Sequence, residues 1–392
     1  MSGVVFILAY TLSQFFRSFL AVIAPELSTE LNLSAADLGT MSAVWFVTFA
    51  LAQFPVGWAL DHIGPRRTIP VLMTAAVAGA LLFARAARDW HCHLAMALIG
   101  LGCSPVYMGA LYVFGRLYKP ERFAMLSSWL LGVGLAGNLL GTAPLAYAAR
   151  TFGWRPTFAG IAVLTLAIAA LARWAVRDPP RAANPSSGGH ALRDLAGIAA
   201  IRALWPLVPI ALVSYAVVIA ERAIWIGPYF AEVHGLDTIA RGNAALAMAV
   251  AMVIGAFAYG PLDRLFGSRR GVVLAGSAVT GLAFLALGLW PQPDVRVAVG
   301  LLAAIGVFGS TYAVLMAHAR SFFPEHLLGR GITFMNFLFI GGAGLIQVLS
   351  GVLVDALTVR GIEPAETYAA LHFALGAALL LSAAVYVAAR ER

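Results

Sequence analysis

Three charged side chains fall deep inside apolar stretches of the sequence. Arg17 lies thirteen residues into the first stretch, and Glu221 and Arg222 lie in the middle of the seventh. A charge at the centre of a membrane costs at least about 2.5–3.5 kcal/mol, so charges there usually serve a function. Two guanidinium groups match the oxygens of a carboxylate or phosphate. The three residues therefore predict an anion bound by Arg17 and Arg222, with Glu221 as a proton-binding group.

The residues around Arg17 are polar at helical spacing. One face of a helix would carry Tyr10, Gln14, Arg17 and Ser18, at positions i, i+4, i+7 and i+8. We expect this face to line a cavity. Tyr10 and Gln14 are therefore predicted substrate contacts beside Arg17.

The seventh stretch repeats this arrangement. Tyr215 and Arg222 share a helix face, and Glu221 is turned away from them by about 100°. Tyr215 is thus another predicted substrate contact. A second interpretation stays open, in which Arg17 and Glu221 form a structural ion pair and backbone carbonyls hold Arg222.

Several further residues could line the same cavity. We include Tyr107 and Asn336 as substrate contacts, although packing and interhelical hydrogen bonds would explain them as well. Packing is also favoured for a row of residues on one helix face, Trp45, Phe49 and Gln53. Glycines inside the fifth stretch indicate helix–helix contacts, namely Gly132, Gly134, Gly137 and Gly141. His318 is expected to contact lipid headgroups or loop carboxylates.

The composition specifies the elements that position these side chains. Of the 392 residues, 61% are hydrophobic and 11% are charged, with a mean hydropathy of +0.86, whereas soluble domains carry roughly 25% charged residues. Apolar runs near 20 residues long suit membrane helices rather than barrel strands. We predict an all-α membrane protein with twelve spans, at about 4–27, 38–60, 69–88, 94–115, 123–148, 155–176, 204–230, 241–262, 271–290, 297–318, 331–357 and 366–389.

Charge asymmetry predicts the topology. With a cytoplasmic N-terminus, seventeen Lys and Arg residues fall on the cytoplasmic side and seven on the other, as the positive-inside rule requires. This bias accounts for the net charge of +8 without nucleic acid. We expect a multi-pass protein of the inner (plasma) membrane with both termini cytoplasmic. A polar linker, residues 178–202, would separate two six-helix halves, 1–177 and 203–392.

The two halves share three pairs of motifs at nearly one offset. Asp61 to Arg67 (DHIGPRR) recurs as Asp263 to Arg270 (DRLFGSRR), at an offset of 202. Arg116 to Glu121 recurs at Arg320 to Glu325, offset by 204, and the pair Tyr10 and Arg17 recurs as Tyr215 and Arg222, offset by 205. The chain is therefore predicted to be an internal repeat, an organisation typical of alternating-access transporters.

The first motif resembles the loop signature of the major facilitator superfamily, Gly-x-x-x-Asp-x-x-Gly-x-(basic)-(basic). The second motif stands where that superfamily has a degenerate copy, and Gly153-Trp154-Arg155 also resembles it. Asp61 can cap a neighbouring helix, Gly64 allows a tight turn, and Arg66 and Arg67 can pair with acids between the halves. By this resemblance such contacts hold the outward-facing state shut on the cytoplasmic side. The gating residues so implied are Gly57, Asp61, Gly64, Arg66, Arg67, Asp263, Arg269 and Arg270. In the alternative interpretation, the motif is a charged stop signal that only fixes the topology.

Arginines on the first and seventh helices also resemble those of the organic-phosphate and organic-anion branches of this superfamily. Only Arg17 and Arg222 carry over. We expect a secondary transporter that moves a small organic anion, carboxylate or phosphate, coupled to protons through Glu221. It would act as a monomer in the lipid bilayer, with no cofactor, no metal site, no nucleic-acid partner and no enzymatic activity.

Other functions stay open. A drug/proton antiporter would carry a Gly-Pro-x-x-Gly-Gly pattern where this chain has Gly141-Thr-Ala-Pro144 without the glycines. Two methionines one helical turn apart, Met248 and Met252, could serve a soft-metal importer. A transporter fold can also act as a sensor or assembly factor without moving a solute, which the lack of any sizeable soluble domain disfavours.

Overall fold

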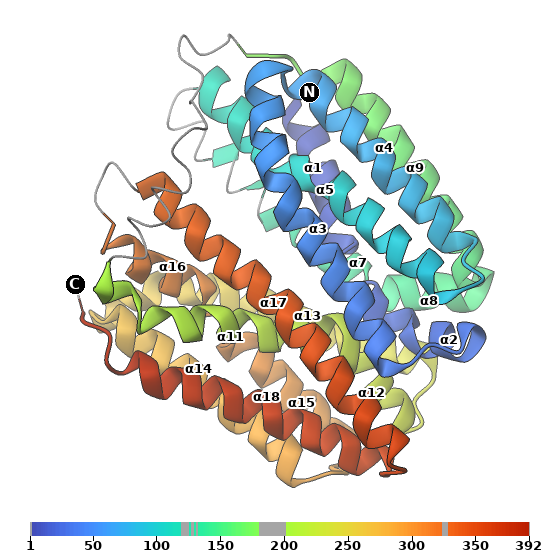
Figure 1. Ribbon diagram of the computed structural model, residues 1–392, viewed down its shortest axis with the longest axis vertical. Coiled ribbons are helices and arrows are strands. Elements are labelled where there is room, and N and C mark those ends of the chain that lie inside the picture. The colour runs from blue at the N-terminus through green and yellow to red at the C-terminus, as the bar shows by residue number, and fades with distance from the viewer. Residues whose placement is uncertain are drawn as a thin grey trace. The chain divides into compact units, whose positions relative to one another are not determined.

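The computed structural model describes residues 2–118, 125–126, 129–130, 132–179, 201–323 and 328–391. All regular elements in these ranges are helices (Figure 1). Within these ranges, ten helices are long and apolar enough to cross a membrane, or eleven if the first two, joined by a bend of 46°, form one span. The chain is therefore a multi-pass helical membrane protein, as predicted, and the count of twelve spans stays a prediction.

Contacts divide the chain into two compact units. Unit 1 comprises residues 1–186 together with the short segment 237–243, and unit 2 comprises residues 187–236 and 244–392. The predicted linker, 178–202, lies mostly outside the described residues. The helices of unit 1 are α1 (Ser2–Phe15), α2 (Leu20–Leu31), α3 (Ala35–His62), α4 (Pro65–Ala84), α5 (Asp89–Leu117), α7 (Ala136–Leu140), α8 (Ala143–Phe152) and α9 (Trp154–Ala175).

Unit 2 begins with a short 3₁₀ turn, η2 (Arg202–Leu204). Its first long helix continues through a π-helical turn, η3 (Glu221–Trp225). The remaining helices are α11 (Leu207–Ala220), α12 (Ile226–Glu232), α13 (Thr238–Phe266), α14 (Arg269–Leu289), α15 (Val295–Phe308), α16 (Tyr312–Arg320), α17 (Leu328–Val359) and α18 (Pro364–Tyr386). The first turn of α13 belongs to the segment grouped with unit 1.

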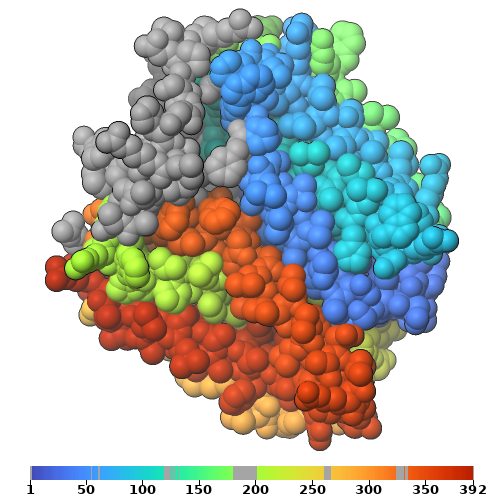
Figure 2. Space-filling model, in the orientation of Figure 1, coloured from blue at the N-terminus to red at the C-terminus, as the bar shows by residue number. Residues whose placement is uncertain are grey.

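The same packing order appears in both units. Within unit 1, α4 packs along α5 and α9, and within unit 2, α14 packs along α18 and α15, as the neighbouring ribbons in Figure 1 show. On the face seen in Figure 2, α17 and α18 form much of the surface of unit 2. Their exposed side chains include Leu345, Leu349, Leu381 and Val385, which suits contact with lipid tails.

The first predicted span, 4–27, is a broken helix. Residues 16–19 form turns, with Arg17 N bonded to Gln14 O and Ser18 N to Phe15 O at 3.2 and 3.0 Å. The Ser18 hydroxyl also donates to the Phe15 carbonyl at 3.2 Å. Such bonds from a serine to a preceding turn bend helices. The prediction of one regular polar face is therefore wrong beyond Gln14, because the chain turns at Arg17.

The seventh predicted span, 204–230, is also irregular. Its π turn begins at Glu221, which is 205 residues after Phe16, the first residue of the break in unit 1. A regular α-helix would place Tyr229, fourteen residues after Tyr215, near the same face as Tyr215. The extra residue of the π turn rotates all later side chains, so Tyr229 does not share that face. Both units thus interrupt their first long helix at the position that carries the arginine.

Candidate functional site

Arg17 lies against two aromatic rings of α3. Its guanidinium carbon is 5.0 Å from the Trp45 ring centre and 4.8 Å from the Phe49 ring centre. The two rings are one helical turn apart and stack on each other, with centroids 5.1 Å apart at 13°. A cation over aromatic faces gains about 0.5–2 kcal/mol, more when water is excluded. Trp45 and Phe49, which we expected to serve in packing, therefore have an additional role, since they hold the Arg17 guanidinium.

Three other predicted contacts meet beside this helix break. Gln14 Nε2 donates to Tyr10 Oη at 3.1 Å, and the Tyr10 and Tyr107 rings lie 5.1 Å apart. Tyr10 and Gln14 are both buried, at 6% and 7% exposure. Unit 1 therefore brings Tyr10, Gln14 and Tyr107 together on α1 and α5.

Glycines allow α1 and the fifth span to approach closely. An ideal Cβ on Gly137 would lie 1.8 Å from the Thr11 carbonyl oxygen, and one on Gly134 would lie 2.2 Å from the Tyr10 ring. One on Gly141 would lie 2.3 Å from Ser18 Oγ, whereas Gly132 has open space. The predicted helix-contact role is confirmed for three of the four glycines. These three allow the fifth span to pack against α1, the helix that carries Tyr10, and against the turn that follows it.

In unit 2, Glu221 and Arg222 are buried, at 0% and 4% exposure. The Glu221 carboxylate lies 3.2 Å from Nε2 of His372 on α18, a side chain that is also 0% exposed. His372 is not among the three charged residues that we predicted inside the spans, because a histidine has no permanent charge that distinguishes it in an apolar helix. The structure adds it to the candidate site.

Tyr215 and Asn336 belong to one polar cluster of unit 2. Tyr312 on α16 donates from Oη to Asn336 Oδ1 on α17 at 3.0 Å, and its ring lies 5.6 Å from that of Tyr215 on α11. All three side chains are partly exposed. Tyr312 was absent from the predicted contacts, because nothing in the sequence showed which residues α16 directs towards α11.

His318 differs from its predicted environment. It is fully buried, and its Nδ1 lies 2.5 Å from Tyr386 Oη. Its Nε2 lies 3.0 Å from the carbonyl oxygen of Arg390. The prediction of headgroup or loop-acid contact is wrong for the described residues, because the chain after α18 folds back over the imidazole.

The loop between α3 and α4 carries the first signature motif. Gly64 adopts a φ of +96°, which favours glycine, so the predicted tight turn is present. Arg66 N donates to Asp178 Oδ1 at 2.8 Å, which places a carboxylate at the N-terminus of α4. Asp178 thus caps this helix from the chain after α9, 112 residues away in sequence.

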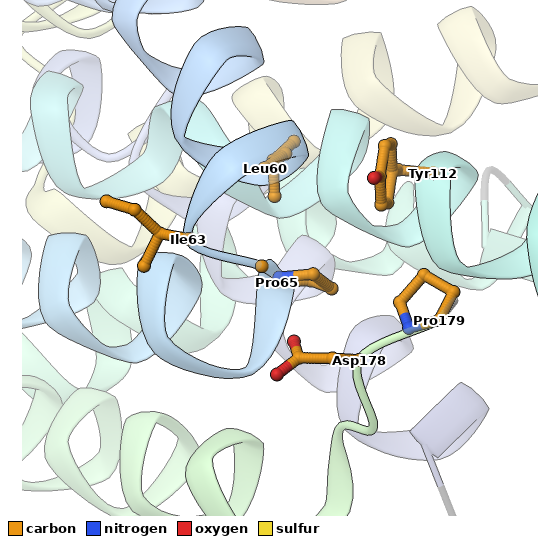
Figure 3. A pocket seen from close by; sticks show the side chains of 7 residues that line it. Leu60, Ile63, Pro65, Tyr112, Asp178 and Pro179 are labelled. Atoms are coloured by element: carbon orange, nitrogen blue, oxygen red, sulfur yellow. The ribbon is translucent and has the colours of Figure 1, made fainter. Parts of the chain in front are cut away.

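A small pocket opens at this turn (Figure 3). Leu60, Ile63, Pro65, Tyr112 and Asp178 line it, together with Gly64 and Pro179. The Arg66 side chain hydrogen-bonds the Arg173 carbonyl oxygen at 3.3 Å. The pocket is therefore formed mainly by the turn between α3 and α4 and by the chain that follows α9.

The remaining gating residues differ in what the structure shows of them. The side chains of Asp61 and Asp263 lie outside the described residues, so capping by Asp61 stays a prediction. Gly57 has open space around it, and Arg67 is exposed.

Basic residues of both motifs bond within their own unit. Arg270, next to Arg269, donates to the Val387 and Ala389 carbonyl oxygens at 3.3 and 2.9 Å. The observed partners of the Arg66 and Arg270 side chains are therefore backbone carbonyls at the ends of α9 and α18. Free carbonyls at helix ends attract such cations. The expected pairing of the signature arginines with acids between the halves stays a prediction.

An ionic cluster lies at the start of α13, within unit 1. Glu26 on α2 pairs with Arg241 and accepts a hydrogen bond from Thr238. Arg150 pairs with Asp237 at 3.1 Å, and the Ala240 backbone N–H and then the Arg150 guanidinium hold the pKa of Asp237 below its usual range. In the predicted topology, Arg150 and Arg241 are two of the seven basic residues on the side opposite the cytoplasm.

A helical membrane protein with buried charges at helix breaks has the architecture of a secondary transporter. A sequence model of the Major Facilitator Superfamily matches residues 6–258. The chain belongs to this superfamily, which confirms the resemblance found in the loop motif.

Two relatives of known sequence cover most of the chain. Membrane sensor protein UhpC of Salmonella typhimurium is 24% identical over 341 residues, 80% of this chain and 76% of the relative. The gentisate transporter of Corynebacterium glutamicum is 23% identical over 345 residues, 85% of this chain and 76% of the relative.

Solved structures show the same fold. A bacterial homolog of the human lysosomal transporter Spinster matches with a TM-score of 0.80 and 20% identity, over 99% of this chain and 96% of that one. A mutant of the nucleoside transporter NupG matches with a TM-score of 0.80 and 12% identity, over 99% of both chains.

Proposed function

We propose that this protein transports a small organic anion by alternating access and that Arg17 and Arg222 both contact the anion during the cycle. The main support is the recurrence of an arginine at a helix interruption in each unit, 205 residues apart, with Arg17 partly buried and Arg222 buried. The gentisate transporter among its relatives carries a name that specifies an aromatic carboxylate. The polar side chains Tyr10, Gln14 and Tyr107 of unit 1, and Tyr215 and Asn336 of unit 2, would complete the contacts with the anion.

Proton coupling follows from the charge of Glu221. Counting only Glu221 and the two arginines, an ionised Glu221 leaves a net charge of +1, and a protonated one leaves +2. An anion is held more tightly in the second state, so anion and proton binding favour each other. We propose symport on this basis, in the inner membrane, by a monomer with cytoplasmic termini, and with the two signature loops biasing one conformational state.

Binding of gentisate, benzoate and glycerol 3-phosphate to the purified protein tests the anion site directly. A ligand of the folded state raises the thermal midpoint. For the best of these ligands, Arg17→Lys and Arg222→Lys should each weaken binding at least about tenfold, because a point charge loses the bidentate geometry.

Arg116→Lys is the matched control. Like Arg17, Arg116 lies over an aromatic ring, that of Tyr112, with its guanidinium carbon 4.4 Å from the ring centre, but Arg116 is exposed near the end of α5. This variant should bind as wild type does. Normal binding by both central lysine variants, or stabilisation only by neutral or cationic solutes, would exclude the proposed role of the arginines.

Ligand sensing without transport is a second candidate function. It is favoured by the two relatives named membrane sensor protein, from Salmonella typhimurium and Escherichia coli. Uptake of radiolabelled ligand into proteoliposomes separates the two functions. A sensor would bind the anion with no uptake above that of empty vesicles, whereas a carrier would show both.

A further inference from the structure

Glu221 and His372 form an isolated polar pair inside unit 2. Both side chains are 0% exposed, with 3.2 Å between the carboxylate oxygen and Nε2. Among the described residues, neither the Glu221 oxygens nor the His372 nitrogens have a well-aligned hydrogen-bond partner. An uncompensated carboxylate in such a site costs several kcal/mol. The pair must therefore hold at least one proton, either on the imidazole or on the carboxyl group.

These two arrangements carry the same net charge. In one arrangement a carboxylate faces an imidazolium, and in the other a carboxylic acid faces a neutral imidazole. The net charge of the pair is zero in both, because they differ only in which group holds the proton. A second proton gives a net charge of +1. Arg222, the next residue along the chain and also buried, opposes that charge. An anion bound at Arg222 would offset this repulsion.

The other titratable groups around the pair are mostly uncharged phenols. Tyr229 on α12 lies edge-on to the His372 ring, with centroids 5.0 Å apart at 87°. Tyr368 on α18 interacts electrostatically with Glu221 and donates a hydrogen bond to Glu232 at the end of α12. From α17, Ser350 contributes a neutral contact, accepting a hydrogen bond from Trp225 at 2.9 Å. Arg222, the residue next to Glu221, is a permanent cation, in contrast to these described neighbours.

A polar path leads away from the pair. The Tyr229 ring contacts the His372 ring, and the Tyr229 hydroxyl lies 3.2 Å from Nε2 of His234 in the loop before α13. His234 is partly exposed. A buried proton site must exchange with water during each cycle, and this loop offers the exchange through Tyr229.

We propose that Glu221 and His372 together are the proton-binding site of this protein and that His372, rather than Glu221 alone, determines when the second proton binds. The proposal rests on the proposed anion transport for its coupling role. The proton site itself is independent of any solute.

Infrared difference spectroscopy at varied pH tests the pair on purified protein in lipid nanodiscs. A carboxylic-acid band should appear as pH falls and be absent in Glu221→Gln. In His372→Gln the midpoint of this band should move by at least about one pH unit, a tenfold change in proton affinity. In the reciprocal measurement, NMR of ¹⁵N-labelled histidine should show one resonance whose titration moves in Glu221→Gln. That readout remains if His372→Gln fails to fold.

His318→Gln is the matched control, because His318 is equally buried but has hydrogen bonds to Tyr386 and a backbone carbonyl instead of a carboxylate. It should leave the carboxyl titration unchanged. A wild-type midpoint in His372→Gln, or an unmoved histidine resonance in Glu221→Gln, would show that the pair does not share protons.

Proteoliposome transport of radiolabelled gentisate separates this inference from the proposed function. His372→Gln should retain counterflow and lose stimulation by a pH gradient. Full stimulation in this variant would overturn the coupled site while anion transport stands. If wild type moves no gentisate, benzoate or glycerol 3-phosphate, the transport proposal fails, and the infrared and NMR titrations still decide the proton site.

Discussion

At the scale of single residues, the sequence identified the charged residues inside the spans but not the residue that caps α4. Arg17, Glu221 and Arg222 could be selected from the sequence because a charge stands out in an apolar helix. A histidine has no permanent charge that marks it in an apolar helix, and only the fold places His372 of α18 beside Glu221 of η3. Asp178 caps α4 from a segment far away in sequence, so no local pattern could identify it.

The Asp178 cap leads to a prediction about stability. Asp178→Ala should lower the free energy of unfolding by about 0.5–2 kcal/mol, the usual contribution of a side-chain cap. Asp178→Asn should retain much of it, because an amide oxygen can still accept from Arg66 N. Thermal unfolding in detergent measures both variants. Equal midpoints for wild type and Asp178→Ala would show that water replaces the carboxylate without loss.

At the scale of helices, the sequence predicted apolar spans and glycine contacts but not the interruptions. A run of apolar residues reports length and polarity, and these remain when a helix turns. The break at Arg17 depends on the Ser18 hydroxyl and on the approach of Gly141. Its place is therefore decided by a contact between α1 and the fifth span, which a single sequence does not show.

Glycine contacts give a prediction at this scale with controls built into the chain. An ideal Cβ would lie 1.8 Å from the Thr11 carbonyl oxygen at Gly137, and 2.0 Å from that of Leu212 at Gly342. Alanine at either position must push two helices apart and should reduce folded yield and thermal midpoint. Alanine at Gly132 or Gly341, which have open space, should be neutral or stabilising by up to about 1 kcal/mol, since alanine favours helix.

Size-exclusion profiles and thermal unfolding of the four alanine variants measure this difference. The outcome that contradicts close helix packing is equal behaviour of Gly137→Ala and Gly132→Ala. The same comparison applies separately to Gly342 and Gly341, so each unit is tested by itself.

At the scale of the whole molecule, the motif offsets predict an internal repeat, and two local features recur within the two units. Both units interrupt the helix that carries the arginine, and both use a motif arginine to hold carbonyls at the end of a later helix. The predicted linker, by contrast, falls mainly on residues that the structure does not describe, and the membrane orientation depends on charge bias alone.

Reporter fusions test that orientation. A reporter inserted between Pro185 and Gly189 should be active only as a cytoplasmic fusion, and one inserted after Pro291 only as an external fusion. Because the seventeen-to-seven distribution of basic residues specifies the orientation, external activity at the first position would invert the topology and revise the number of spans.

The π turn at Glu221–Trp225 contains one residue more than an α-helical turn would. If the π turn moved by one position along the chain, the side chain that it passes would rotate by about 100°, while the helical segments on either side would keep their hydrogen bonds. Glu221 and Arg222 are among the residues that such a migration would turn. Migration of the π turn would therefore change the direction of the Glu221 carboxylate and the Arg222 guanidinium, while α11 and α12 keep their packed positions.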